Sequence, residues 1–234
     1  MLKFIKIPIF LIVLFCTFSI CVSANTINTP IIISDEPSPQ GVETACEPDC
    51  PETPFPIGPY SWQYAYNITL PSGCVVTVQY KTRFACNTWH DLYIAEITAQ
   101  NSNDPICNNY FTTTSAAQIL ADVTMQMLIT NPMGFPPDSI GECESNWRVV
   151  KGACWQKLNI NWGNATYPTQ HYRLYPCQGG ICCLDHFQVC INQYGVREIT
   201  SLPGSINGTC IPQETQPHSL GCEVVCGHPD NDDI

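Results

Sequence analysis

Cysteines are the side chains most able to do chemistry in this sequence of 234 residues, and fourteen of them follow residue 24. The spacing Cys-x-x-Cys, which redox pairs and zinc ribbons share, does not occur. An even number of cysteines at varied spacings is typical of exported proteins, because oxidising compartments convert thiols into disulfides. We therefore expect up to seven disulfides, formed among Cys46, Cys50, Cys74, Cys86, Cys107, Cys143, Cys154, Cys177, Cys182, Cys183, Cys190, Cys210, Cys222 and Cys226.

The vicinal pair Cys182 and Cys183 lies close to His186 and has the residue types of a thiolate site. Thiolate catalysis needs a free sulfur beside a base. Cysteines of an exported, even-numbered set are mostly bridged, so disulfides are the favoured interpretation. We assign no catalytic residue to this cluster.

Cys222, Cys226 and His228 are residue types that bind metals. Their spacing does not match a zinc motif, and export again favours a disulfide. The equally spaced Cys46 and Cys50 are candidate partners for Cys222 and Cys226. The sequence therefore indicates neither a metal site nor a cofactor.

Catalysis without cysteine also lacks a clear signal. The nucleophile motif Gly-x-Ser-x-Gly is absent from the sequence. His90 and Asp91 are neighbours, as are Asp185 and His186, and neighbouring side chains in a strand point to opposite faces. A carboxylate pair assembled from distant residues gives no local motif. We therefore expect a non-enzymatic protein, with a secreted hydrolase built from scattered Asp, Glu and His residues as the alternative.

Aromatic residues are the remaining signal for binding, with five Trp and ten Tyr in the chain. Trp147, Trp155 and Trp162 lie near or within predicted strands, where their rings could stack on sugars or contact a partner. Rings at such positions more often fill a core. Three glycosylation sequons are also present, at Asn67, Asn164 and Asn207.

Residues 1–24 have the composition of a signal peptide. A basic start precedes an apolar run over residues 7–21, and small residues at positions 22 and 24 fit a cleavage site. The apolar run is short for a membrane-spanning helix. We expect the mature protein to begin at Asn25, to be secreted or held in the cell envelope, and to have no membrane span.

Two acidic ends flank a nearly neutral body. Residues 25–59 hold six acids, eight prolines and no base, and residues 211–234 hold five acids and no base. We interpret them as an extended arm and a solvated tail on either side of a folded domain at 60–210. The absence of a basic stripe argues against binding to nucleic acid.

Ile31, Ile32 and Ile33 form an isolated apolar triplet within the acidic arm. The triplet could complete a sheet of its own domain as an edge strand. It could also be donated to a neighbouring copy across the proline-rich linker, so that copies associate by β-augmentation. The sequence leaves both alternatives open.

An alternation of apolar and polar residues predicts strands over residues 60–70 and 74–86, followed by a third strand over 91–99. Pro71-Ser72-Gly73 predicts the turn between the first two strands. Short connections indicate an antiparallel meander with one covered face. Asn67 falls on the polar face of the first strand.

One helix is predicted after the meander. Ser115 can cap its start, Gln118 completes a capping box, and Asn131-Pro132 ends it. Its apolar residues share one face: Ala116, Ile119, Leu120, Val123, Met127 and Leu128.

Strands resume after the helix. Residues 147–151 and 154–160 flank Gly152 and predict a hairpin, and further strands follow between residues 171 and 200. The whole pattern predicts a mainly β, α+β fold. We expect an antiparallel, sheet- or sandwich-like domain with one helix packed on a face and multiple disulfides.

Three motifs stand out in the body of the chain: Asn131-Pro-Met-Gly-Phe-Pro-Pro137, Trp147-Arg-Val-Val-Lys-Gly-Ala-Cys-Trp155, and Cys182-Cys183 with Val189-Cys190. Together they resemble an uncharacterised group of secreted, cysteine-rich bacterial proteins over about residues 60–190. The resemblance implies an exported bacterial domain and brings no activity or site with it.

The function most consistent with these patterns is that of an exported surface, envelope or matrix protein stabilised by disulfides. Its expected partner is another protein, its own copies through the N-terminal arm, or a glycan.

Overall fold

Strands provide most of the regular structure in the computed structural model, which describes residues 31–32, 64–99, 104–162, 169–177, 182–206 and 219–226. The mainly β, α+β fold expected from the sequence is confirmed, although these ranges hold two helices where one was predicted. In chain order the elements are β1 (Ile31–Ile32), β2 (Tyr64–Thr69), β3 (Val75–Ala85), β4 (Trp89–Ala99), α1 (Pro105–Thr113), α2 (Ala116–Thr130), β5 (Cys143–Gly152), β6 (Cys154–Trp162), β7 (Thr169–Pro176), β8 (Cys182–Ile191), β9 (Arg197–Ile206) and β10 (Ser219–Val224).

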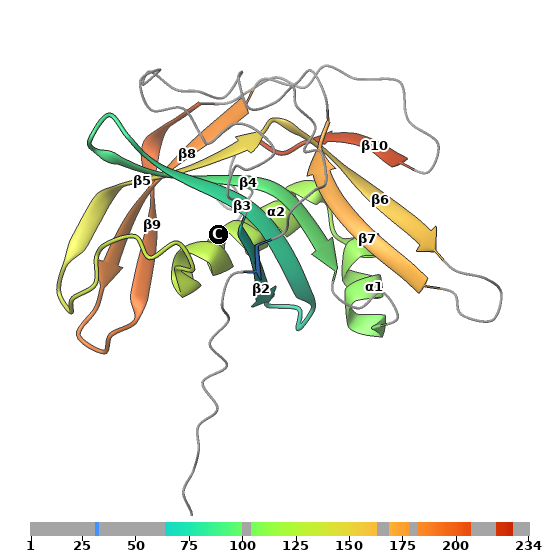
Figure 1. The fold of residues 1–234 in the computed structure, drawn as a ribbon, viewed down its shortest axis with the longest axis horizontal. Helices are drawn as coiled ribbons and strands as arrows, with labels where there is room; N and C mark the ends of the chain where they lie inside the picture. Colours follow the sequence, from blue (N-terminus) through green and yellow to red (C-terminus); the bar gives the residue numbers. More distant parts are fainter. Residues whose placement is uncertain are drawn as a thin grey trace, which may run out of the picture.

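Strand β4 is the branch point of one curled sheet (Figure 1). Strand β3 pairs with it along one edge. On the other edge, residues 90–93 pair in parallel with residues 147–150 of β5, whereas residues 97–98 pair antiparallel with β7. The sheet therefore divides into two wings, one formed by β5, β8 and β9 and the other by β7, β6 and β10.

The predicted hairpin between β5 and β6 is wrong, because the chain passes from one wing to the other at this point. Strand β5 pairs with β4 and β8, and β6 pairs with β7 and β10. Gly152 allows the crossing, since a Cβ there would lie 2.8 Å from Cβ of Pro176. The indole Nε1 of Trp155 donates to the Gly152 carbonyl (2.8 Å). A glycine that signals a hairpin in sequence thus marks a change of strand partners.

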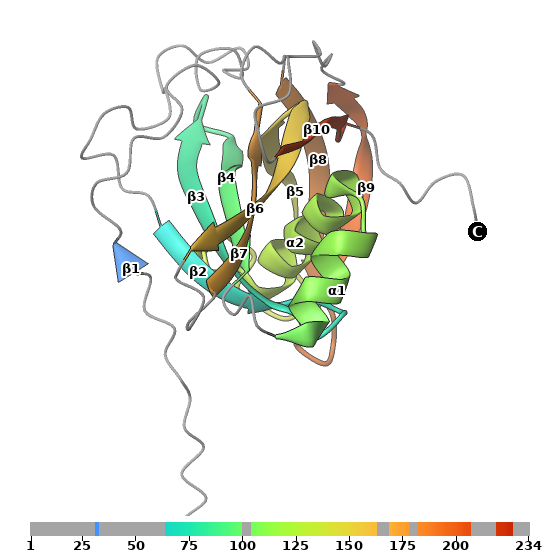
Figure 2. The same ribbon diagram turned by 90° about the vertical axis from the view of Figure 1, so that its right-hand side faces the viewer.

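Helix α2 lies in the hollow of the sheet, where it contacts β2, β6, β9 and β10 (Figures 1 and 2). Its predicted apolar face is confirmed, and it forms one core with the inward-facing residues of the strands. The buried side chains of the helix are Ala116, Ile119, Leu120, Val123, Thr124, Met127 and Leu128. The helix therefore supplies the core that holds the two wings together.

The ends of α2 follow the sequence signals closely. Ser115 Oγ accepts a hydrogen bond from the Gln118 backbone N–H, as the capping box predicts. The Gln118 side-chain amide donates instead to Asp122 Oδ1 (2.8 Å), so only half of the box forms. Asn131 ends the helix in a left-handed conformation (φ 48°), with its N–H donating to the Met127 carbonyl.

Helix α1 was not predicted, because nine residues rich in Asn and Thr give little apolar periodicity. Its start nevertheless has a recognisable signature: Asp104 accepts from the Ile106 N–H (2.9 Å), and Pro105 occupies the first turn. Cys107, Tyr110 and Phe111 form its buried side. The Asp-Pro dipeptide is the signal that could have identified this helix.

All eleven cysteines in the described ranges are disulfide-bonded. Four bridges are Cys74–Cys107, Cys143–Cys190, Cys177–Cys222 and Cys183–Cys226. Cys222 and Cys226 therefore do not pair with Cys46 and Cys50, the partners suggested by equal spacing. Cys46, Cys50 and Cys210 lie outside the described residues.

The last two bridges fasten β10 to the sheet, which corrects the interpretation as a solvated tail for residues 219–226 of the range 211–234. Residues 219–224 of that range pair with β6, and Val225 is buried with its N–H donating to the Ala153 carbonyl (2.9 Å). Counting acids over residues 211–234 as one segment did not distinguish the short apolar run at residues 224–225.

Strand β1 pairs with β2 of the same chain, with Ile31 opposite Ala65 and Ile32 opposite Tyr64. This is the edge-strand alternative for the apolar triplet, of which Ile33 lies outside the described residues. Donation of the triplet to a second copy stays a prediction. The predicted signal peptide and the rest of the acidic arm also lie outside the described ranges.

Candidate functional site

Two of the three tryptophans that were candidates for a binding surface fill the core instead. Trp147 and Trp155 are buried, and their indole N–H groups donate to the carbonyls of Pro136 (2.6 Å) and Gly152 (2.8 Å). Trp162 is the last residue of β6, and its side chain does not belong to the described part of the structure. Of the sequon asparagines, Asn67 is exposed on β2 as predicted, and Asn164 and Asn207 lie outside the described residues.

The cysteine–histidine cluster at the start of β8 does not form a thiolate site. Cys182 and Cys183 are both disulfide-bonded. His186 stacks on Trp89 with ring centroids 5.4 Å apart. Burial, reinforced by the positive charge of Arg148, lowers the pKa of His186 below its ordinary value, although Asp185 and Asp91 oppose the shift.

Buried carboxylates in the sheet are held by cations. Asp91 on β4 accepts from Arg83 Nε on β3 (2.7 Å) and from Arg148 Nε on β5 (2.6 Å). Asp185 on β8 pairs with Lys151 on β5 at 2.7 Å. His90 points away from Asp91 and packs between the rings of Phe84 and Phe135, which confirms that these neighbours face opposite sides. These carboxylates therefore have structural partners.

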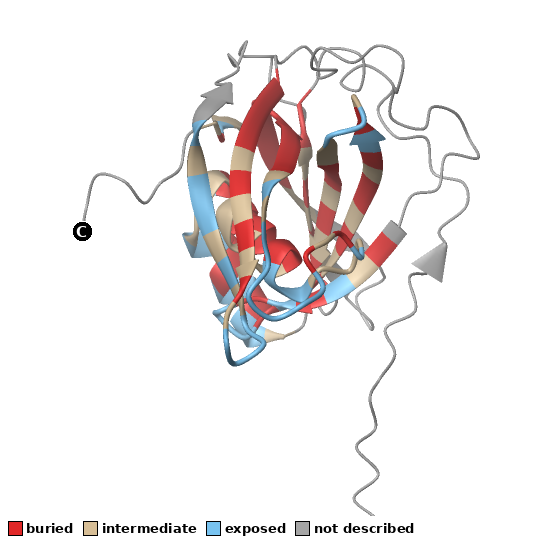
Figure 3. Cartoon of the chain, turned by 90° about the vertical axis from the view of Figure 1, so that its left-hand side faces the viewer, coloured by how far each residue is buried: buried red, intermediate tan, exposed pale blue. Residues whose placement is uncertain are grey.

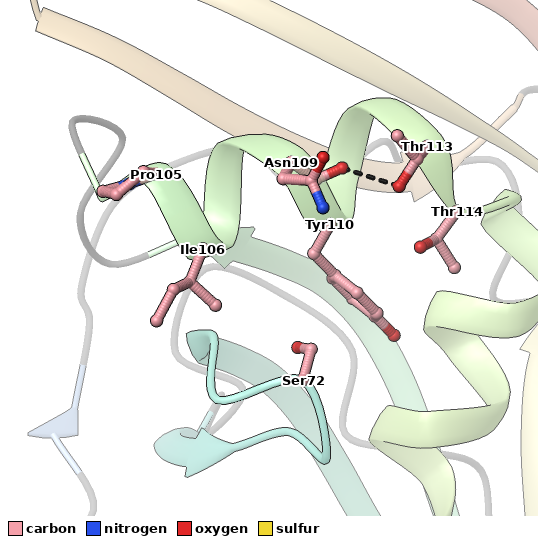
Figure 4. A pocket seen from close by; sticks show the side chains of 7 residues that line it. All are labelled: Ser72, Pro105, Ile106, Asn109, Tyr110, Thr113 and Thr114. Carbon is pink, nitrogen blue, oxygen red and sulfur yellow. Dashed lines mark hydrogen bonds between the residues drawn. The ribbon is translucent and has the colours of Figure 1, made fainter.

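An open groove of about 530 Å³ runs along α1 (Figure 4). One wall is Ser72 in the turn between β2 and β3, and the helix provides the other wall. Every lining residue is uncharged: Ser72, Pro105, Ile106, Asn109, Tyr110, Thr113 and Thr114.

The two walls of the groove are joined covalently. The disulfide Cys74–Cys107 links the end of the turn to the first turn of α1. Gly73 adopts φ +87°, and a Cβ on it would lie 3.8 Å from a methyl carbon of Ile106. The turn and the helix therefore lie close together beside the bridge, and the disulfide limits the width of the groove at this end.

Tyr110 lines the inner side of the groove and connects α1 to α2. Its hydroxyl donates to Asp122 Oδ2, and Asp122 Oδ1 accepts from the Gln118 amide (2.8 Å). Burial, then the hydrogen bond and negative charge of Asp122, raise the pKa of Tyr110 far above its ordinary value. The phenol therefore remains neutral, and the groove keeps an uncharged surface over the whole physiological pH range.

Polar groups along the rim are available to a ligand. The Thr113 hydroxyl donates to the Asn109 carbonyl (2.8 Å), which leaves its oxygen lone pairs as acceptors. Among the described residues, none hydrogen-bonds the Asn109 side-chain amide, which offers both donors and an acceptor. Ile106, 48 % exposed, adds an apolar contact surface beside these groups. The groove can therefore hold a neutral ligand by hydrogen bonds and apolar contact.

Sequence reasoning did not find this groove. Its polar residues are common types without a motif, and the disulfide that joins the Ser72 turn to α1 links cysteines 33 residues apart in the sequence. The pairing of fourteen cysteines cannot be deduced from their spacing.

No family model, curated protein or solved structure matches the chain. The resemblance to a group of secreted bacterial proteins stays a prediction. Within the described ranges, no set of three or more His, Cys, Asp or Glu side chains is placed to hold a metal ion. None of the helices described is both long and apolar enough to cross a membrane.

Proposed function

We propose that this chain is an exported, disulfide-stabilised, non-enzymatic binding protein of a cell surface, envelope or extracellular matrix, and that the groove along α1 binds a glycan. The observation that carries the proposal is the covalent link between the two groove walls by Cys74–Cys107. A surface fixed before binding loses little conformational entropy when the ligand arrives. Such a groove is suited to a ligand held by a few weak contacts.

The lining favours a glycan among the three partner classes expected from the sequence. Neutral sugars present hydroxyl groups along their edges and C–H groups on their faces. The Asn109 amide and the Ser72 and Thr113 hydroxyls match the edges, and Ile106 provides a surface for a sugar face. An ionic ligand would find no counter-charge among the seven lining residues.

The alternative of a secreted hydrolase has less support at this groove. Hydrolysis of a glycosidic bond uses two carboxyl groups on either side of the scissile bond. None of the lining residues is Asp, Glu or His. The nearby Asp122 already accepts hydrogen bonds from Tyr110 and Gln118, which assigns it a positioning role.

An array of neutral oligosaccharides, probed with the oxidised mature protein, tests the proposal. A glycan bound on the array is then titrated against Asn109→Ala and against Thr112→Ala. Thr112 is the matched control, because it is an exposed residue of α1 whose hydroxyl also donates to backbone carbonyls, yet it does not line the groove.

We expect Asn109→Ala to weaken binding roughly tenfold, the scale of a lost pair of neutral hydrogen bonds, and Thr112→Ala to bind like the parent. The bound oligosaccharide should remain intact after long incubation. The absence of any bound glycan, or equal affinity in both variants, would contradict the proposed site; release of shorter sugars would favour the hydrolase.

A further inference from the structure

Large apolar side chains are exposed together at one end of the β5–β8–β9 wing. Tyr194 and Ile140, 79 % and 65 % exposed, are the most exposed of their kind in the described residues, and Val196 is 55 % exposed. We call these three residues the apolar tip. Figures 1 and 3 show the two loops that carry them, the α2–β5 connection and the β8–β9 turn, side by side at this end.

Backbone hydrogen bonds join the two loops of the tip. The Gly141 N–H donates to the Ile191 carbonyl (2.7 Å), and the Ile191 N–H donates to the Glu142 carbonyl (2.9 Å). The disulfide Cys143–Cys190 joins the next residues along β5 and β8. Ile140 is therefore held beside the turn that carries Tyr194 and Val196.

Asn192 fixes the turn itself. Its Oδ1 accepts from the backbone N–H groups of Tyr194 (2.9 Å) and Val196 (3.0 Å), and its Nδ2 donates to Glu198 Oε1 (2.8 Å). Gly195 supplies the positive φ (+75°) that the turn requires. A rigid loop that presents an exposed tyrosine resembles the aromatic anchors that dominate binding energy in protein interfaces.

The charges around the apolar tip are mainly negative. Residues 138–144 and 192–198 contain four acids, Asp138, Glu142, Glu144 and Glu198, and one base, Arg197. The Arg197 guanidinium turns inward, since its Nη2 donates to the Pro137 carbonyl (2.9 Å) and its Cζ lies 5.8 Å from the centre of the Trp147 ring. An apolar centre with a charged rim is the usual anatomy of a protein interface.

We propose that the apolar tip docks a protein partner whose contact segment combines apolar side chains with lysine or arginine. Charge complementarity selects this occupant, because like charges facing each other across an interface are unfavourable. A second copy would bring the same acidic rim against this one, and an anionic membrane would repel it. The tip is a surface separate from the groove along α1.

The test uses a library of random peptides displayed on phage, panned on the oxidised full-length mature protein. Peptides that bind are then measured in solution against Tyr194→Ser and against Val224→Ser. Val224 is the control, because it is 57 % exposed on β10 and lies outside the tip.

We expect the selected peptides to combine apolar residues with an excess of lysine and arginine. Tyr194→Ser should weaken their binding by roughly tenfold or more, as truncation of an aromatic anchor does, and Val224→Ser should leave it unchanged. Raising the salt concentration from about 0.05 to about 0.5 M should weaken binding, because the shorter Debye length screens the rim.

Selected peptides without a basic excess, or peptides that bind Tyr194→Ser as well as the parent, would overturn the proposal. Dimerisation of the parent that Tyr194→Ser abolishes, or parent binding to phosphatidylserine vesicles through the same residue, would overturn it in favour of those occupants. Glycan binding by Tyr194→Ser should equal that of the parent. A negative result for the apolar tip therefore does not bear on the proposed glycan site in the groove.

Discussion

Asp91 joins three neighbouring strands through its two carboxylate oxygens, which accept from Arg83 on β3 and Arg148 on β5. The Arg148 guanidinium also lies over the Trp89 ring, with Cζ 4.7 Å from the ring centre. The sequence could place Asp91 and His90 on opposite faces, but it could not identify the partners of Asp91. Arg148 is 57 residues away, on a strand whose neighbours are decided by the fork in the sheet.

Replacement of Asp91 by asparagine should lower the free energy of unfolding by about 3–5 kcal/mol, because it leaves buried guanidinium groups without their counter-charge. Urea denaturation measures this difference. Asp138→Asn is the control, since Asp138 is exposed, and it should stay within about 0.5 kcal/mol of the parent. A change below about 1 kcal/mol for Asp91→Asn would show that the ion pairs are not important for stability.

The lowered pKa of His186 predicts a pH dependence of stability. The unfolded chain binds the proton more readily than the folded protein does, so stability is complete above the ordinary histidine pKa and declines as pH falls towards the folded pKa. His186→Gln should therefore lose less stability than the parent between about pH 7.5 and about pH 5. Melting temperatures measured at both pH values provide the test, and identical losses in parent and variant would contradict the assignment.

Among the elements, local pattern predicted most of the strands and α2, but it missed α1 and β10, which tertiary contacts and disulfides hold in place. The alternation in β2 and β3 and the apolar face of α2 follow directly from burial against one core. Helix α1 has only three buried residues, and its cap, the Cys74–Cys107 bridge and the Tyr110–Asp122 hydrogen bond help to hold it, so periodicity gave no signal. The crossing at Gly152 depends on its contact with Pro176, which no local pattern contains.

Val123→Asp tests the packing of α2 in the hollow of the sheet. Val123 is fully buried, and a carboxylate there would have no partner, so the free energy of unfolding should fall by roughly 3–5 kcal/mol. Ile129→Asp is the control on the same helix, because Ile129 is 40 % exposed and should tolerate the charge far better. Thermal unfolding followed by circular dichroism compares the two. Similar losses in both variants would mean that the core is not where the structure places it.

At the scale of the whole molecule, disulfides connect the parts that the sheet leaves apart. The four bridges described close segments of 33 to 47 residues, and two of them hold β10 against the body. The described cysteines are all bridged, as the cysteine count predicted, and export to an oxidising compartment stays a prediction. The bridge pattern itself was not predictable, and with it neither was the groove, since Cys74–Cys107 joins the two segments that line it.

The Cys74–Cys107 bridge should prepare the groove for its ligand, and the affinities of two double variants measure this effect. Cys74→Ala with Cys107→Ala removes the groove bridge, and Cys143→Ala with Cys190→Ala removes a bridge of similar span elsewhere. Calorimetric titration with an array-selected glycan is carried out at a temperature where both variants and the parent are folded. We predict that the first variant binds roughly tenfold more weakly, because its groove must be ordered on binding, and that the second binds like the parent. Equal affinity in all three proteins, or an equal loss in both variants, would show that the Cys74–Cys107 bridge does not prepare the groove for its ligand.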